Sequence, residues 1–198
     1  HYTPERATLI VVGDISVEEV ISEAKSHFGS WETPGGQSTL ISPEVEDRKS
    51  PRTTIFLANK SDAVQSIIQA SFLTVSRSHP DFYALNILND IFGGQFSARL
   101  NMNLRQDKGY SYGYMSAIDW LTSASAFVAG GSVHAVVTKE AVQETLKEFT
   151  DIAGPRPVTS DEFAAAHDGI VRGFPSAFET QQQILAQMSR MVLFDLPH

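Results

Sequence analysis

The stretch FSARLNMNLRQDKGYSYGY, residues 96–114, reads as a helix followed by a strand. Phe96, Leu100 and Leu104 recur at every fourth position, and this spacing predicts the apolar face of a helix. Gly109 is of the residue type that most often ends a helix, and the tyrosines after it favour a strand. The junction therefore brings Arg105, near the helix end, close to Tyr112.

Two interpretations of this junction stay open on the residues alone. Arg105 can compensate the dipole at the helix C-terminus, and tyrosines are ordinary strand residues. Alternatively, a permanently charged guanidinium and a phenol reach together towards a substrate carbonyl or an oxyanion. Arg105 and Tyr112 are therefore the candidate catalytic and substrate-binding residues.

The surrounding sequence predicts an α+β fold, a largely antiparallel β-sheet with helices packed on one face. Apolar or β-branched runs predict strands over residues 7–14, 53–59, 65–73, 110–120 and 124–137. Capping boxes predict helices after Ser16, Thr159 and Thr180, and further helices are expected over 79–94, 96–109 and from Thr138. In the last of these we expect the inward face to carry Val142, Leu146, Phe149 and Ala153.

Composition excludes several classes of function. The 198 residues carry a formal net charge of −8, which argues against nucleic acid or an anionic membrane as the main partner. There is no cysteine, so neither disulfides nor thiolate chemistry is available. No apolar run approaches the roughly 20 residues that span a bilayer, and no P-loop or dinucleotide motif is present.

The six histidines do not form a recognisable metal motif. No two of them are spaced by three or four positions on one helix, and neither H-E-x-x-H nor H-x-x-E-H occurs. His167 lies beside Asp168 without a second ligand nearby in sequence, so a surface histidine is the simpler interpretation. We therefore predict no metal ligands and no cofactor in this chain.

Read with its surroundings, FGGQFSARLNMNLRQDKGYSYGY (92–114) resembles the non-zinc domain of the pitrilysin/insulinase family of zinc metallopeptidases. That domain carries S-[SA]-R-L-x-x-x-L-R, then three residues, a glycine, two residues and a tyrosine. The matching positions here are Ser97, Ala98, Arg99, Leu100, Leu104, Arg105, Gly109 and Tyr112. YTPERATLIVVGDISVEEVISEAKSHFGSW (2–31) and PVTSDEFAAAHDGIVRGF (157–174) are similar to flanking parts of the family pattern. Tyr110 departs from it, since leucine is commoner there.

The resemblance implies a fold of the mitochondrial-processing-peptidase type and a composite active site. Zinc would lie on a homologous partner domain or subunit, and this domain would contribute Arg105 and Tyr112 to hold a peptide substrate and its tetrahedral intermediate. Arg99 would be structural and tie its helix to neighbouring backbone. Without H-x-x-E-H this chain should bind no catalytic zinc and should be inactive alone.

The resemblance also implies a domain organisation. We expect residues 1–30 to be the tail of a preceding homologous domain, 31–52 a linker, and 53–198 the non-zinc domain, truncated at its C-terminus. The resemblance to bacterial members of the family favours an exported, periplasmic location for this protein. One alternative is a catalytically silent scaffold or peptide-binding subunit of the same fold, and another is an unrelated α+β ligand-binding domain.

Overall fold

The computed structural model describes residues 3–33 and 53–197, which fall into two units. One unit, called here the sheet unit, is Val45–Arg172. The other, the terminal unit, combines His1–Glu44 with Gly173–His198. Arg105 and Tyr112 both belong to the sheet unit, so its architecture decides how the candidate site is built.

The described part of the sheet unit contains three antiparallel strands, β1 (Gln65–Thr74), β2 (Ser111–Asp119) and β3 (Ser125–His134). Their order in space is β1-β3-β2, so β3 is central and β2 is an edge strand. Gly130 of β3 pairs with Gln69 on one side and with Met115 on the other. The strands expected over 65–73, 110–120 and 124–137 are therefore confirmed.

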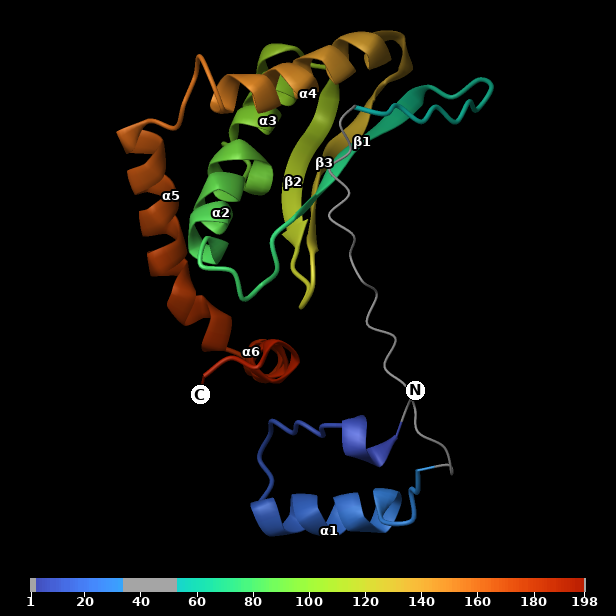
Figure 1. Ribbon diagram of the computed structural model, residues 1–198, viewed down its shortest axis with the longest axis vertical. Helices are drawn as coiled ribbons and strands as arrows, with labels where there is room; N and C mark the ends of the chain where they lie inside the picture. Colours follow the sequence, from blue (N-terminus) through green and yellow to red (C-terminus); the bar gives the residue numbers. More distant parts are fainter. Residues whose placement is uncertain (1–2, 34–52, 198) are drawn as a thin grey trace. The chain divides into compact units, whose positions relative to one another are not determined.

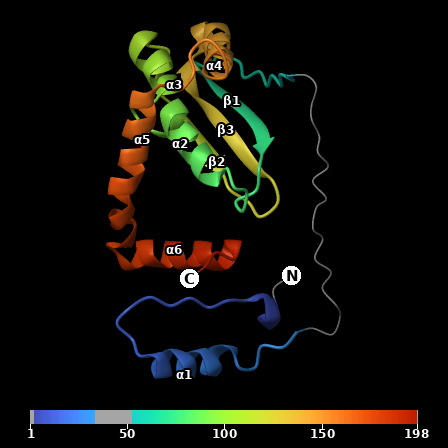
Figure 2. The same cartoon turned by 60° about the vertical axis from the view of Figure 1, so that its left-hand side comes forward.

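Helices α2, α3 and α4 lie against one face of this sheet (Figures 1 and 2). The helices of the sheet unit and their continuations have the following bounds: α2 Phe82–Asn89, a π-helical turn Asp90–Gly94, α3 Arg99–Asn101, a second π-helical turn Met102–Asp107, a 3-10 turn Ala135–Val137, α4 Thr138–Ile152 and α5 Ser160–Gly173. A sheet covered on one face by helices confirms the predicted α+β class.

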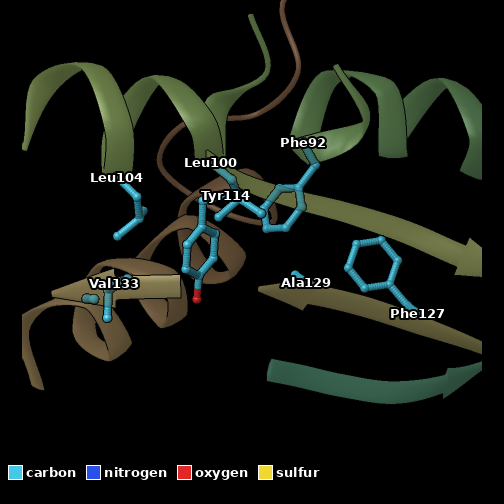
Figure 3. Close-up of a cluster of buried hydrophobic side chains, with 8 residues drawn as sticks. Phe92, Leu100, Leu104, Tyr114, Phe127, Ala129 and Val133 are labelled. Atoms are coloured by element: carbon cyan, nitrogen blue, oxygen red, sulfur yellow. The ribbon is translucent and has the colours of Figure 1, made fainter. Parts of the chain in front are cut away.

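The core lies between the sheet and these helices (Figure 3). Its buried members are Phe92, Leu100, Leu104, Tyr114, Phe127, Ala129, Val133 and Ala141. Tyr114 is fully buried, and its hydroxyl lies 2.8 Å from the hydroxyl of Thr145 on α4. Burial raises the pKa of the Tyr114 phenol, and the bond to Thr145 offsets part of that rise. This tyrosine belongs to the core, unlike Tyr112.

Gly93 lets the end of the α2 segment approach β2 closely. A Cβ built at this position would lie 2.5 Å from the hydroxyl oxygen of Ser116 and 2.7 Å from its backbone nitrogen. Distances this short are repulsive, so a larger residue would push the helix away from the strand. Gly93 thus sets the helix-to-sheet distance, and the helix ends at Gly94.

Among its described residues the terminal unit contains two capped helices, α1 (Val17–Phe28) and α6 (Gln181–Phe194), and 3-10 turns at Pro4–Arg6 and Phe174–Phe178. Ser16 with Glu19, and Thr180 with Gln183, form the predicted capping boxes. No helix in the described ranges combines the length and the apolar character that crossing a bilayer requires.

Two predicted strands are wrong. Residues 7–14 and 53–59 belong to no strand, and Phe56 is 92% exposed. A strand needs a neighbour for its backbone hydrogen bonds, and the described residues pair neither segment. Prediction from apolar and β-branched composition alone therefore gave more strands than the described structure contains. Most of the predicted linker, residues 34–52, lies outside the described residues.

The predicted inward face of α4 is wrong at Leu146 and Ala153, which are exposed. The buried positions are instead Ala141, Thr145, Glu148 and Asp151. Phe149 does pack against the core, although it is only partly buried. The helix is thus rotated so that polar side chains face inward. These polar groups belong to the frame that supports the candidate site.

Candidate functional site

Arg105 lies near the end of the helical segment of residues 99–107, where buried leucines fix the backbone. Leu100 and Leu104 are fully buried beneath it. The segment ends with hydrogen bonds from the Lys108 amide to the Asn103 carbonyl and from the Tyr110 amide to the Leu104 carbonyl. Gly109 then has a φ of 63°, a left-handed conformation that costs glycine little. The chain turns sharply from the helix into β2.

Tyr112 lies in a β-bulge at the start of β2. Ser111 pairs with Val133 and Tyr114 pairs with Gly131, so three steps along β2 match two along β3. The Ser111 hydroxyl oxygen lies 2.7 Å from the carbonyls of Gly113 and Ser132, and it accepts a bond of 3.1 Å from the Gly113 amide. Bulges commonly redirect a side chain next to a functional site. Here the redirected side chain is Tyr112, which is 89% exposed.

The structure brings the two predicted site residues together. The central carbon of the Arg105 guanidinium lies 5.1 Å from the centroid of the Tyr112 ring. The same carbon lies 4.5 Å from the centroid of the Phe96 ring. Both distances are within the range of a cation–π interaction. The guanidinium is therefore held at the surface by two aromatic rings.

The donors of this pair are free to bind a ligand. Within the described part of the chain, no carboxylate pairs with Arg105, and no group forms a hydrogen bond with the Tyr112 hydroxyl. A guanidinium offers a fixed fork of N–H donors, and a phenol adds a neutral O–H donor. An exposed cluster of this kind can bind a carboxylate, a polarised carbonyl or an oxyanion.

Arg99, at the other end of the same helical segment, has the structural role that we expected. Its side chain is only 7% exposed and donates to both carboxylate oxygens of Glu162, each at 2.7 Å. It also donates to the backbone carbonyls of Arg156 and Pro157, at 2.5 and 2.9 Å. This pairing holds the pKa of Glu162 at about 2 and raises that of Arg99. The start of the helix is thereby tied to the α4–α5 connection and to α5.

A second set of polar contacts links the π-helical turn to α4. Asn103 donates to Glu148 at 2.8 Å and to Glu144 at 3.1 Å, and Arg156 reaches the same Glu148 oxygen at 3.3 Å. Lys108 pairs with Glu144 at 3.3 Å. Glu148 is almost fully buried, and its second carboxylate oxygen has no partner in the described structure. The turn that carries Arg105 is therefore anchored on α4.

Asn101 connects the two segments that carry the rings. Its side-chain amide donates to the Phe96 carbonyl at 2.6 Å, and its side-chain oxygen accepts from the Tyr114 amide at 3.1 Å. Asn101 is 1% exposed, so both contacts are sheltered from water. Because the Tyr114 amide directly follows the bulge, this one side chain fixes the bulge relative to Phe96.

The described residues do not fit a catalytic metal. They contain no group of three or more His, Asp or Glu side chains placed to hold an ion. His167 instead lies 3.3 Å from the carboxylate of Asp168 and stacks on Phe163, with ring centroids 6.0 Å apart. A zinc site needs at least three converging protein ligands. Any zinc that serves this site therefore has its ligands outside the described part of the chain.

The sequence patterns did not identify two residues of the site, Phe96 and Asn101. Phe96 was assigned to the buried helical face, but it precedes the helix and is 55% exposed. Asn101 was treated as an ordinary helical position. The usable signal for Phe96 was the Ser97-Ala98 pair after it, because a serine before a helix often marks its start. Nothing in the sequence indicates the tertiary contacts of Asn101.

Comparison with known proteins gives a consistent family. Residues 1–169 match the family model described as the peptidase M16 inactive domain. The uncharacterized zinc protease YmxG of Bacillus subtilis is 30% identical over 149 residues, which cover 74% of this chain and 34% of the relative. A zinc protease of Mycobacterium tuberculosis is 27% identical over 175 residues, or 87% of this chain and 37% of the relative. The chain thus spans about a third of the length of these relatives.

Solved structures share the fold. A protease from Helicobacter pylori superposes with a TM-score of 0.78 at 18% identity and covers 93% of this chain and 44% of its own. The peptidase M16 inactive domain from Pseudomonas fluorescens superposes with a TM-score of 0.61 at 22% identity, over 68% of this chain and 32% of its own. At these identities the likeness concerns the fold alone.

Proposed function

The chain belongs to the peptidase M16 family, as its inactive domain, and from this we propose that it is the non-zinc half of a zinc metallopeptidase that hydrolyses peptides. In this proposal Arg105 and Tyr112 complete an active site whose zinc lies on a homologous domain or subunit. The observation that carries the proposal is their proximity. The bulge and Gly109 bring a guanidinium and a phenol together at the surface, and no described residue occupies their donors.

The proposed chemistry of these two residues is hydrogen bonding to the oxygen of the scissile carbonyl. The Arg105 guanidinium is a cation that donates in a fork, so it can bind the carbonyl and then the oxyanion that replaces it. Tyr112 adds a second donor from β2. One well-placed donor of this kind contributes about 3 kcal/mol to the transition state. Metal chemistry would come from the other domain.

The proposed substrate is an extended peptide segment. β2 is an edge strand, and edge strands offer backbone groups to which an extended chain can hydrogen-bond. Tyr112 is at the start of this strand, so a peptide held along β2 would pass the Arg105–Tyr112 pair. The proposal therefore links peptide binding and carbonyl recognition through one strand.

The test is peptidase activity of the full-length protein together with its zinc-bearing domain, on a quenched fluorescent peptide. We expect Arg105→Ala and Tyr112→Phe each to lower kcat by about tenfold or more. Two surface controls of the same residue types, Arg172→Ala and Tyr83→Phe, should stay close to wild type. Both controls are well exposed and lie elsewhere in the sheet unit.

Unchanged kcat in Arg105→Ala and Tyr112→Phe, with zinc content and unfolding temperature intact, would contradict the proposal. That result would favour the alternative of a catalytically silent scaffold or peptide-binding subunit. Peptide binding without turnover in the complete wild-type protein would support the same alternative. A scaffold has no need of free donors on a bulged tyrosine, and for this reason the enzymatic role is preferred.

A further inference from the structure

Phe96 has an exposed ring for which the core offers no explanation. It precedes α3, is 55% exposed and is absent from the buried cluster formed by Leu100 and Leu104. The Phe96 ring contacts the Arg105 guanidinium, whose central carbon lies 4.5 Å from the ring centroid. The same carbon lies farther, 5.1 Å, from the centroid of the Tyr112 ring. The exposed ring thus contacts the cation on which the proposed function depends.

A ring in this position limits the movement of the arginine without using its donors. A long arginine side chain on a surface samples many rotamers, and ordering it costs free energy when a ligand binds. An aromatic face attracts the guanidinium through its quadrupole, while the N–H donors around the guanidinium edge stay free. Contact with the ring therefore keeps the cation close to its binding position before the substrate arrives.

The position of the ring is itself fixed by buried contacts. Asn101 accepts from the Tyr114 amide next to the bulge and donates to the carbonyl of Phe96. The residue after Ser97 is also held, because the Ala98 amide donates to the Gln95 carbonyl at 3.1 Å. The backbone at Phe96 is therefore held on both sides, through one buried asparagine and one tight turn.

We propose that Phe96 is a positioning residue, whose ring, together with that of Tyr112, holds the Arg105 guanidinium ready to bind the substrate, and that Asn101 sets the placement of the Phe96 ring relative to Tyr112. The proposal rests on the function proposed above, because it assigns Phe96 a role through Arg105. It adds a residue whose proposed role is exercised through Arg105.

Kinetics of the full-length protein with its zinc-bearing domain give the first test. We expect Phe96→Leu to lower kcat about two- to fivefold, with a smaller change in KM, since the guanidinium matters most once the oxyanion forms. Phe96→Tyr keeps an aromatic face and should restore kcat. Phe163→Leu is the matched control, because Phe163 is a similarly exposed phenylalanine, at 49%, and no arginine of the described ranges lies over its ring.

Chemical modification gives a second test that does not depend on catalysis. Phenylglyoxal reacts with accessible guanidinium groups, and mass spectrometry of the digested protein measures the rate at Arg105. We expect Phe96→Leu to speed modification of Arg105 but not of Arg172, while Phe96→Tyr and Phe163→Leu keep the wild-type rates. Equal rates at Arg105 in wild type and Phe96→Leu would overturn the positioning role.

The two tests separate the two proposals. If Arg105→Ala and Tyr112→Phe lose activity while Phe96→Leu matches wild type in kcat and modification rate, only the role of Phe96 fails. If Arg105→Ala and Tyr112→Phe are fully active, the proposed function fails, whatever the modification rates. Failure of Phe96→Tyr to restore kcat would also overturn the positioning role, since it would show that size or shape, and not the aromatic face, is required.

Discussion

Arg99 and Arg105 lie six positions apart on one helical segment, yet their surroundings are opposite. Arg99 is buried, with both oxygens of Glu162 and two backbone carbonyls around its guanidinium. Arg105 is partly exposed, with two aromatic rings as its recorded contacts. An arginine whose donors bind a carboxylate and backbone carbonyls anchors the helix, whereas Arg105, which contacts two rings in the described structure, keeps its donors for a ligand.

The largest expected effect comes from removing the anchor. Arg99→Ala leaves the Glu162 carboxylate and two carbonyls without their donor, and breaking a largely buried ion pair in this way costs about 3 kcal/mol of unfolding free energy. Arg105→Ala should change stability by less than about 0.5 kcal/mol, as surface substitutions usually do. Urea denaturation of both variants measures the difference. Similar losses of unfolding free energy in the two variants would show that Arg99 anchors the helix no more strongly than Arg105.

Asn101→Leu should have the next largest effect. The substitution keeps a similar volume but removes the partners of the Phe96 carbonyl and the Tyr114 amide, both at a buried position. Leaving buried polar groups unpaired costs about 2 kcal/mol. The same denaturation experiment detects this loss, and Asn86→Leu, where the partly buried asparagine also bonds a carbonyl, serves as a comparison. A fully stable Asn101→Leu variant would show that the asparagine does not hold the two segments.

Gly109→Ala tests the turn that brings Arg105 close to β2. An alanine at a φ of 63° is strained, by about 1 kcal/mol. Gly113→Ala is the control, because a Cβ there meets no atom within 4 Å and its φ is not in the left-handed region. We expect Gly109→Ala to lower the unfolding free energy and Gly113→Ala to leave it nearly unchanged. Equal stabilities would remove the case for a strained turn.

The last prediction concerns protonation at the anchor, and it is tested in acid rather than at neutral pH. Hydrogen bonds from Arg99 hold the pKa of Glu162 at about 2, below its ordinary 4.5. A lowered pKa in the folded state stabilises the protein above pH 4.5, and this stability is lost as the pH falls towards 2. Glu162→Gln should therefore show a shallower loss of stability between pH 4.5 and 2 than wild type, measured by thermal unfolding. Parallel pH profiles would contradict this linkage.

The local part of the fold was predictable from the sequence. Ser16 with Glu19, and Thr180 with Gln183, form capping boxes because the participating groups are only three residues apart. The hairpin of β2 and β3 follows from alternating residues around a short polar turn. The strands predicted over 7–14 and 53–59 are not formed, because a strand needs a partner strand that local composition cannot reveal.

The site was only partly predictable for a related reason. Arg105 and Tyr112 are separated by one turn, so Gly109 alone indicates that they approach each other. Whether they catalyse anything is still a prediction. Phe96 and Asn101 depend on contacts across the fold, and a phenylalanine four positions before Leu100 has the same pattern as a core residue. The regular spacing of apolar residues therefore does not distinguish a buried ring from an exposed ring that contacts a cation.

The bulge at Tyr112 has an evolutionary consequence. Ser111 and Tyr114 are both buried, with two residues between them where a regular strand has one. Deleting one codon, that of Tyr112, would restore regular alternation and leave every core side chain in place. A family member could thus lose its phenol in a single genetic step and survive as a stable, silent paralogue. An unfolding temperature of the deletion variant close to wild type would show that this route is open.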